Sequence, residues 1–285
     1  MSQNNYSTWL AALLKEIKHD RVMIFIHGYA NPWTKVIDPS DANYGLTAML
    51  GHFWSYGGLK IPLIGPIVVF DWPSTGTYHE AQKKGADTAT KSFKSPYSKV
   101  DLKQIIDDIA KAKPRARINI VCHSMGNYVF AKGAGSLTPH SVSLAFINAA
   151  AIDAQSFDPD SRSPTLADGI QQCVGNALIL NTSNDDALPE VSDKPDTGGD
   201  PWVELGIWNV APAPQYYSCT GCFDLSDVVN KANQDGAEKV HTAYYYIPLV
   251  LDFINFYLNF DFAEADKSAI ANSAQVKRIN LPVPA

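Results

Sequence analysis

The chain has 285 residues, of which 46% are hydrophobic and 18% charged, and 23 Lys and Arg against 29 Asp and Glu give a net charge of −6. This apolar content suffices for a folded core and excludes wholesale disorder, and the acidic balance argues against nucleic acid as the partner. No apolar run reaches the roughly 20 residues that a transmembrane helix needs.

Short apolar runs spaced along the chain predict buried strands. They are nearly continuous stretches of branched residues rather than strict alternations of apolar and polar residues, a pattern typical of strands buried on both faces of a parallel sheet. The predicted strands cover residues 21–27, 66–71, 118–122, 142–147 and 177–180.

Helical spacing of apolar residues appears between these runs. Within residues 100–112, for example, Leu102, Ile105, Ile106 and Ile109 share one face, and Pro114 ends the helix. Alternation of strands and helices predicts an α/β protein with a doubly wound parallel sheet, which we take as a single domain spanning 1–285. The predicted helices cover residues 8–19, 45–57, 80–94, 100–112, 126–134 and 243–258, the last kinked or begun by Pro248.

Two later segments depart from this pattern. Residues 189–235 are rich in Pro, Gly and Asp, and we interpret them as a lid-like insertion over the end of the sheet. Its aromatic residues either line an acyl pocket or form a small core of their own. Cys219 and Cys222 are one CxxC pair without a second pair at zinc spacing, which favours a local disulfide or two thiols over a metal site. The polar stretch 267–285 is interpreted as a loose tail.

The sharpest chemical signal follows the third predicted strand. The strand runs into Ser124, Gly126 follows two residues later, and a helix begins there. A serine nucleophile on a strand–turn–helix elbow requires small neighbours two residues before and after it. Gly126 meets this requirement, and Cys122 stands where Gly is usual. The alternative is a serine in an ordinary β-to-α turn.

Five motifs follow one another along the chain: Phe25-Ile-His-Gly-Tyr29, Phe70-Asp-Trp-Pro-Ser74, His123-Ser-Met-Gly-Asn127, Ser183-Asn-Asp-Asp-Ala-Leu188 and Val240-His241. With these motifs in this order, the chain resembles the α/β-hydrolase superfamily, and more narrowly an uncharacterised, mostly bacterial family within it. That family usually has Ser where Asp71 stands. The resemblance implies the α/β-hydrolase fold and a Ser–acid–His mechanism without fixing a substrate.

The resemblance also implies the remaining site residues. It places the acid after the strand at 177–180, where Asp185 matches the Asp-x-Ala-Leu pattern; Asp186 and Asp153 are the alternatives. The base follows the acid in chain order, and His241 is the only His after residue 140.

The loop after the first predicted strand and the residue after Ser124 supply the rest of the implied site. The backbone N–H groups of Tyr29 and Met125 would form the oxyanion hole. His27 and His123 flank the serine, and we expect both to be structural hydrogen-bonding residues.

The sequence thus predicts a serine hydrolase of carboxylic esters that uses no cofactor or metal and acts on a small-molecule substrate. A thioesterase, lipase or amidase would use the same triad, and an inert hydrolase-fold binding protein is the non-enzymatic alternative. The absence of a signal-peptide pattern predicts a cytoplasmic protein. The oligomeric state is not predicted.

Overall fold

A parallel β-sheet forms the centre of the described part of the chain. The computed structural model describes residues 3–18, 20–30, 46–47, 49–51, 65–90, 101–149, 166–182, 185, 187, 220–229, 240–245 and 247–259. Within these residues six strands lie in the order β2-β1-β3-β4-β5-β6, and every neighbouring pair is parallel. The strands are β1 (Arg21–Ile26), β2 (Ile67–Phe70), β3 (Arg117–His123), β4 (Val142–Asn148), β5 (Val174–Asn181) and β6 (Thr220–Asp224).

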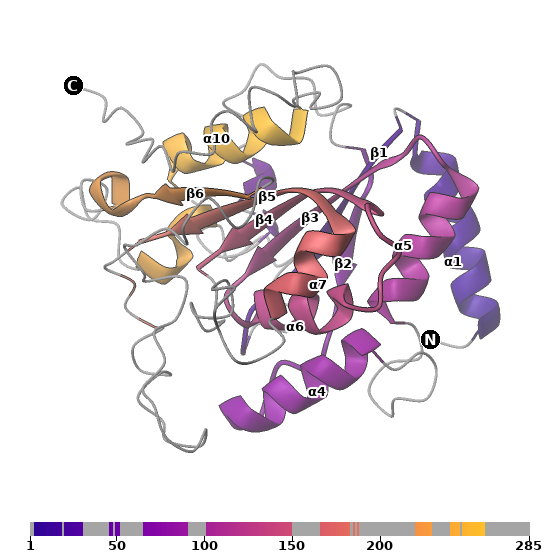
Figure 1. Cartoon of the computed structure of the whole chain (residues 1–285), viewed down its shortest axis with the longest axis horizontal. Helices are drawn as coiled ribbons and strands as arrows, with labels where there is room; N and C mark the ends of the chain where they lie inside the picture. Colours follow the sequence, from indigo (N-terminus) through magenta and orange to yellow (C-terminus); the bar gives the residue numbers. More distant parts are fainter. Residues whose placement is uncertain are drawn as a thin grey trace.

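Helices cover both faces of this sheet, which confirms the doubly wound α/β architecture (Figure 1). On one face lie α4 (Tyr78–Thr90), α5 (Leu102–Ala112), α6 (Met125–Ala134) and α7 (Leu166–Cys173), with α1 (Gln3–Glu16) beside α5. On the other lies α10 (Pro248–Asn259), preceded by the 3₁₀ helix η5 (Val240–Tyr245). No described helix is long and apolar enough to cross a membrane.

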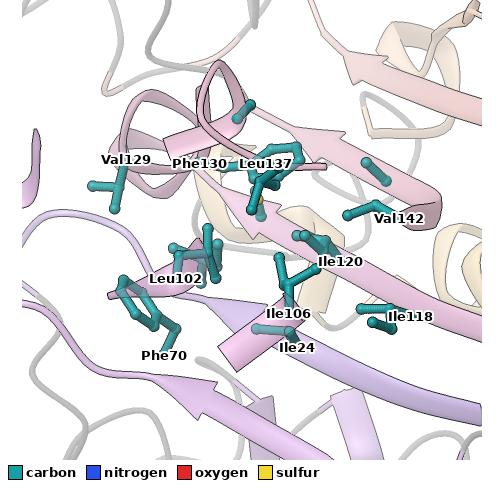
Figure 2. Close-up of a cluster of buried hydrophobic side chains, with 14 of the residues drawn as sticks. Ile24, Phe70, Leu102, Ile106, Ile118, Ile120, Val129, Phe130, Leu137 and Val142 are labelled. Atoms are coloured by element: carbon teal, nitrogen blue, oxygen red, sulfur yellow. The ribbon is translucent and has the colours of Figure 1, made fainter. Parts of the chain in front are cut away.

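Successive residues of the central strands supply two separate cores, because alternate side chains point to opposite faces of a sheet. In β1, Ile24 belongs to the core beneath α5 and α6, whereas Phe25 belongs to the core beneath α10. Figure 2 shows Ile106 of α5 beside Ile24 of β1 and Ile120 of β3, and Leu102 of α5 near Phe70 of β2. Burial of both strand faces explains the continuous apolar runs of the sequence.

The amphipathic helix α5 shows how local sequence fixes one element. Asp101 caps its N-terminus by accepting a hydrogen bond from the Gln104 N–H at 2.6 Å. Tyr6 of α1 donates a hydrogen bond to Asp108 at 2.9 Å, which ties the first helix to α5. The predicted helix at 100–112 is therefore confirmed nearly to the residue.

The structure also contains two elements that the sequence did not predict. Helix α7 precedes β5, and β6 pairs with β5 at the sheet edge. Because β6 and the helical residues 226–229 lie within the stretch 189–235, that stretch contributes a strand to the sheet. The rest of the stretch, Cys219 included, and the predicted tail lie outside the described residues, so the predicted lid, disulfide and tail stay predictions.

Helix limits differ from the predicted ones at both ends of the chain. Helix α1 begins at Gln3, before the predicted residue 8. Pro248 begins α10 rather than kinking a longer helix, and η5 occupies 240–245. Proline is favoured in the first turn of a helix because the N–H it lacks would have no partner there.

Candidate active site

Ser124 occupies a strained turn between β3 and α6. Its backbone has φ 53° and ψ −127°, a conformation that a residue with a Cβ rarely adopts. The Ser124 N–H donates to the Asn148 carbonyl at 3.0 Å. The Asn127 side-chain NH₂ donates to the carbonyls of both Ser124 and Asn148, each at 2.9 Å. These bonds hold the turn in its strained form.

Two glycines allow the chain to pass close to this turn. A Cβ on Gly126 would lie 2.3 Å from the Ile26 carbonyl oxygen and 2.6 Å from that of His27. A Cβ on Gly28 would lie 3.0 Å from the Ser124 Cβ. The requirement for a small residue two positions after the serine therefore comes from contact with the end of β1.

We expect Gly126→Ala to destabilise the fold by roughly 1–3 kcal/mol, because the added methyl overlaps backbone atoms that cannot rotate away. Gly135→Ala, just past the other end of α6, is the matched control. A Cβ there meets nothing within 4 Å, and the φ of −62° suits alanine. Urea unfolding of both variants measures the difference, and equal stabilities would contradict the packing argument.

Asp185 and His241 are brought together from positions 56 residues apart. The His241 Nδ1 lies 2.8 Å from Asp185 Oδ2 and 3.0 Å from Oδ1. The Asp185 side chain is fully buried, and that of His241 is 15% exposed. The Ala187 N–H also donates to Asp185 Oδ1 at 3.0 Å. The buried carboxylate thus accepts a hydrogen bond from Nδ1–H, which leaves Nε2 as the basic nitrogen of the ring.

His241 lies on η5, next to the residue that precedes the serine. Its carbonyl oxygen is 2.7 Å from His123 Nε2, and the two rings are 4.7 Å apart. The structure therefore brings Ser124, His241 and Asp185, three residues named from the sequence, to the carboxyl ends of β3 and β5. The alternative acids Asp153 and Asp186 lie outside the described residues.

The loop after β1 holds the predicted oxyanion donor Tyr29. Its hydroxyl donates to the Gly76 carbonyl at 2.5 Å, and the next residue, Ala30, donates its N–H to the Ser74 carbonyl at 2.8 Å. Met125, the other predicted donor, is the first residue of α6 and is fully buried. The first N–H groups of a helix have no partner within it and carry partial positive charge.

His27 links the β1 loop to the segment after β2. Its Nε2 is 3.3 Å from Asp71 Oδ1, and its ring stacks on Trp72 with ring centroids 5.4 Å apart. The Trp72 indole N–H donates to the His27 carbonyl at 2.8 Å. His27 is thus a buried hydrogen-bonding residue, as expected, and Trp72 of the Trp-Pro motif fixes the backbone just before Gly28.

His123 is a fully buried titratable group directly before the serine. Burial, followed by the nearby charge of His241, lowers its pKa from 6.5 to about 3. Among the described residues no group of His, Cys, Asp or Glu could hold a metal ion.

The lowered pKa of His123 predicts a loss of stability in acid. Between pH 6.5 and about 3 the unfolded chain takes up a proton at this residue and the folded chain does not, so stability falls as the pH drops below 6.5. At pH 4.5 we expect this residue to contribute roughly 2–3 kcal/mol of the loss. Urea unfolding at pH 7 and 4.5 measures it. The His123→Gln variant should lose correspondingly less, and an equal loss in both proteins would contradict the assignment.

Sequence reasoning missed the contacts that hold these residues in place. Asn127 was part of a quoted motif, but its bonds to Ser124 and Asn148 depend on the position of β4. The bond between His123 and His241 joins residues 118 positions apart. Neither contact has a local sequence signal beyond the closeness of His123 and Asn127 to Ser124 along the chain.

The sequence of this chain is similar to that of one described protein family. Residues 2–193 match the sequence model of a family described as "Alpha/beta hydrolase of unknown function (DUF900)". No curated protein sequence matches the chain significantly.

Solved structures resemble the chain only distantly. An esterase of Pyrococcus furiosus is 12% identical, with a TM-score of 0.43, over 90% of this chain and 83% of that one. A poly(3-hydroxybutyrate) depolymerase of Bordetella parapertussis is 13% identical, with a TM-score of 0.44, over 88% and 83%.

Proposed function

The chain belongs to this family of α/β hydrolases and has the fold its motifs predict, and from that premise we propose that it is a serine hydrolase of carboxylic esters. The observation that carries the proposal is the pairing of His241 Nδ1 with the buried Asp185 carboxylate beside the strained turn of Ser124. A base oriented by an acid next to a serine on a strand-to-helix turn is the arrangement of nucleophilic acyl transfer.

In the proposed mechanism, His241 Nε2 takes the proton from the Ser124 hydroxyl as its oxygen attacks the ester carbonyl. Asp185 keeps the proton on Nδ1 and stabilises the imidazolium that forms. When the tetrahedral intermediate collapses, His241 gives its proton to the leaving alcohol. Water then attacks the acyl-enzyme by the same steps in reverse, which releases the acid and restores Ser124.

The oxyanion of the intermediate would be held by the N–H groups of Tyr29 and Met125. A donor of this kind contributes roughly 10²–10³-fold to kcat because it is fixed before the charge develops. Both assignments follow chain position: Tyr29 comes directly after the glycine packed on Ser124, and Met125 directly follows the nucleophile. No metal or cofactor is required for any step.

Matched acyl substrates test the proposal. The purified protein is assayed with p-nitrophenyl esters of two to twelve acyl carbons, and with a thioester and an anilide of the acyl group it hydrolyses best. The proposal expects saturable ester hydrolysis that exceeds hydrolysis of the anilide. Preference for the thioester would make it a thioesterase. Reversible binding of acyl compounds without turnover would indicate an inert binding protein and would contradict the proposal.

A further inference from the structure

His123 makes its ring contacts on the element that carries the proposed base. The side chain is 1% exposed at the end of β3, directly before Ser124. Its ring centroid is 4.7 Å from those of His241 and Tyr245 and 6.1 Å from that of Tyr244, all three on η5. The ring of His123 is therefore the surface on which this 3₁₀ helix packs above the serine turn.

One hydrogen bond fixes the tautomer of this ring. His123 Nε2 lies 2.7 Å from the His241 carbonyl oxygen. A carbonyl oxygen only accepts, so Nε2 carries the proton and donates it. Nδ1 is buried without a hydrogen-bond partner among the described residues, and a Cβ on Gly28 would lie 3.3 Å from it. Because Nδ1 has no hydrogen-bond acceptor within the described part of the chain, the ring is the neutral Nε2–H tautomer.

His241 is consequently held at two points. Asp185 accepts from its imidazole Nδ1, which sets the direction of the ring. His123 donates to its main-chain carbonyl, which sets the position of the backbone from which the ring extends. Because His123 and Ser124 are consecutive residues, this hydrogen bond connects the backbone of the proposed base to the residue directly before the nucleophile.

We propose that His123 is a positioning residue that holds the proposed base His241 at its working distance from Ser124 through the hydrogen bond from Nε2 to the His241 main-chain carbonyl. The expected effect on kcat rests on the proposed function, whereas the expected effect on the position of His241 rests on the geometry alone. The residue touches no reacting atom in this scheme and acts through His241 alone.

The neutral state of His123 supports this role. A positive charge 4.7 Å from the His241 ring would oppose formation of the imidazolium during attack. Burial keeps the pKa of His123 at about 3, so the ring stays uncharged where the enzyme would work. His123 thus supplies a hydrogen-bond donor without adding a charge beside the base.

Two variants of similar length separate the donor from the bulk of the side chain. His123→Gln retains an N–H donor at nearly the reach of Nε2, whereas His123→Met fills similar space without one. On the best ester, we expect His123→Met to lower kcat about 10- to 100-fold while KM stays within about twofold of the wild-type value. We expect the kcat of His123→Gln to stay within about fivefold of wild type. Melting temperatures establish that each variant is folded.

Equal kcat values for His123→Met and wild type would overturn the proposal. Equal losses of kcat in His123→Met and His123→Gln would overturn it too, because the hydrogen-bond donor would then be irrelevant. If His123→Met lowered kcat and raised KM together, the site would be generally distorted, and this result would also count against the proposal.

A second measurement does not depend on turnover. In nitrogen-15 NMR of the wild type, His123 should be a neutral Nε2–H ring from pH 5 to 8, and the His241 Nδ1 proton should give a slowly exchanging downfield signal. The His241 signal should be lost in His123→Met and kept in His123→Gln. A protonated or Nδ1–H ring of His123, or an unchanged His241 signal in His123→Met, would overturn the positioning role. If these signals behave as expected while no ester is turned over, the proposed function fails and the positioning role stands.

Discussion

Replacing Ser124 with alanine is expected to lower kcat for ester hydrolysis by at least roughly 10⁴-fold, because the variant has no nucleophile and only binding and oxyanion contacts remain. The fold should survive. No hydrogen bond of the Ser124 side chain caps α6, and alanine adds no atom to the strained turn. Steady-state kinetics on the best ester measures the loss, and the melting temperature establishes that the protein is folded.

Ser136→Ala is the matched control. Ser136 is exposed just past the C-terminal end of α6, and its hydroxyl donates to the Gly133 carbonyl in the same turn. We expect kcat for this variant to equal that of wild type. Turnover by Ser124→Ala within tenfold of wild type would mean that another residue attacks the substrate.

The second large effect is expected at the acid. Asp185→Asn keeps the size of the side chain and removes its charge, so the amide no longer holds the Nδ1–H tautomer of His241 or stabilises the imidazolium. We expect kcat to fall roughly 10⁴-fold. KM should change little, because Asp185 is fully buried behind His241 and reaches no substrate.

Asp186→Asn separates this role from that of a neighbouring carboxylate. Asp186 was an alternative for the acid in the sequence, and the observed pairing of His241 is with Asp185. The account expects Asp186→Asn to retain kcat within a few-fold. If Asp186→Asn were inactive and Asp185→Asn active, the acid would be assigned to the wrong residue.

The sequence predicts the elements whose burial leaves a local pattern. Strands β1, β3 and β4 are buried on both faces and therefore appear as nearly continuous apolar runs. The elbow is equally local, since a strand, a serine and a glycine two residues later specify it. The order Ser, acid, His that the resemblance implies then selected His241, the only His after residue 140, and the structure brings its ring to Asp185.

The missed elements owe their form to contacts distant in sequence. Helix α7 contains Gly169, and glycine within a helix reads as a break. A Cβ there would lie 2.6 Å from the Gly135 nitrogen, so the glycine is required by close packing of α7 on the end of α6. Strand β6 lies within a stretch rich in Pro, Gly and Asp, and its pairing with β5 sets its conformation. Neither contact can be read from a local window of sequence.

Labelling with a fluorophosphonate tests whether Ser124 is an activated nucleophile, because the probe reacts with a serine only when a neighbouring base activates it. The reaction is followed by intact mass and peptide mapping on wild type, His241→Ala and Ser124→Ala. The account predicts a single adduct on Ser124 in wild type, its loss in Ser124→Ala, and labelling at least roughly 10²-fold slower in His241→Ala. A folded wild type that takes up no probe, or an adduct on another residue, would contradict the assignment of Ser124 as an activated nucleophile.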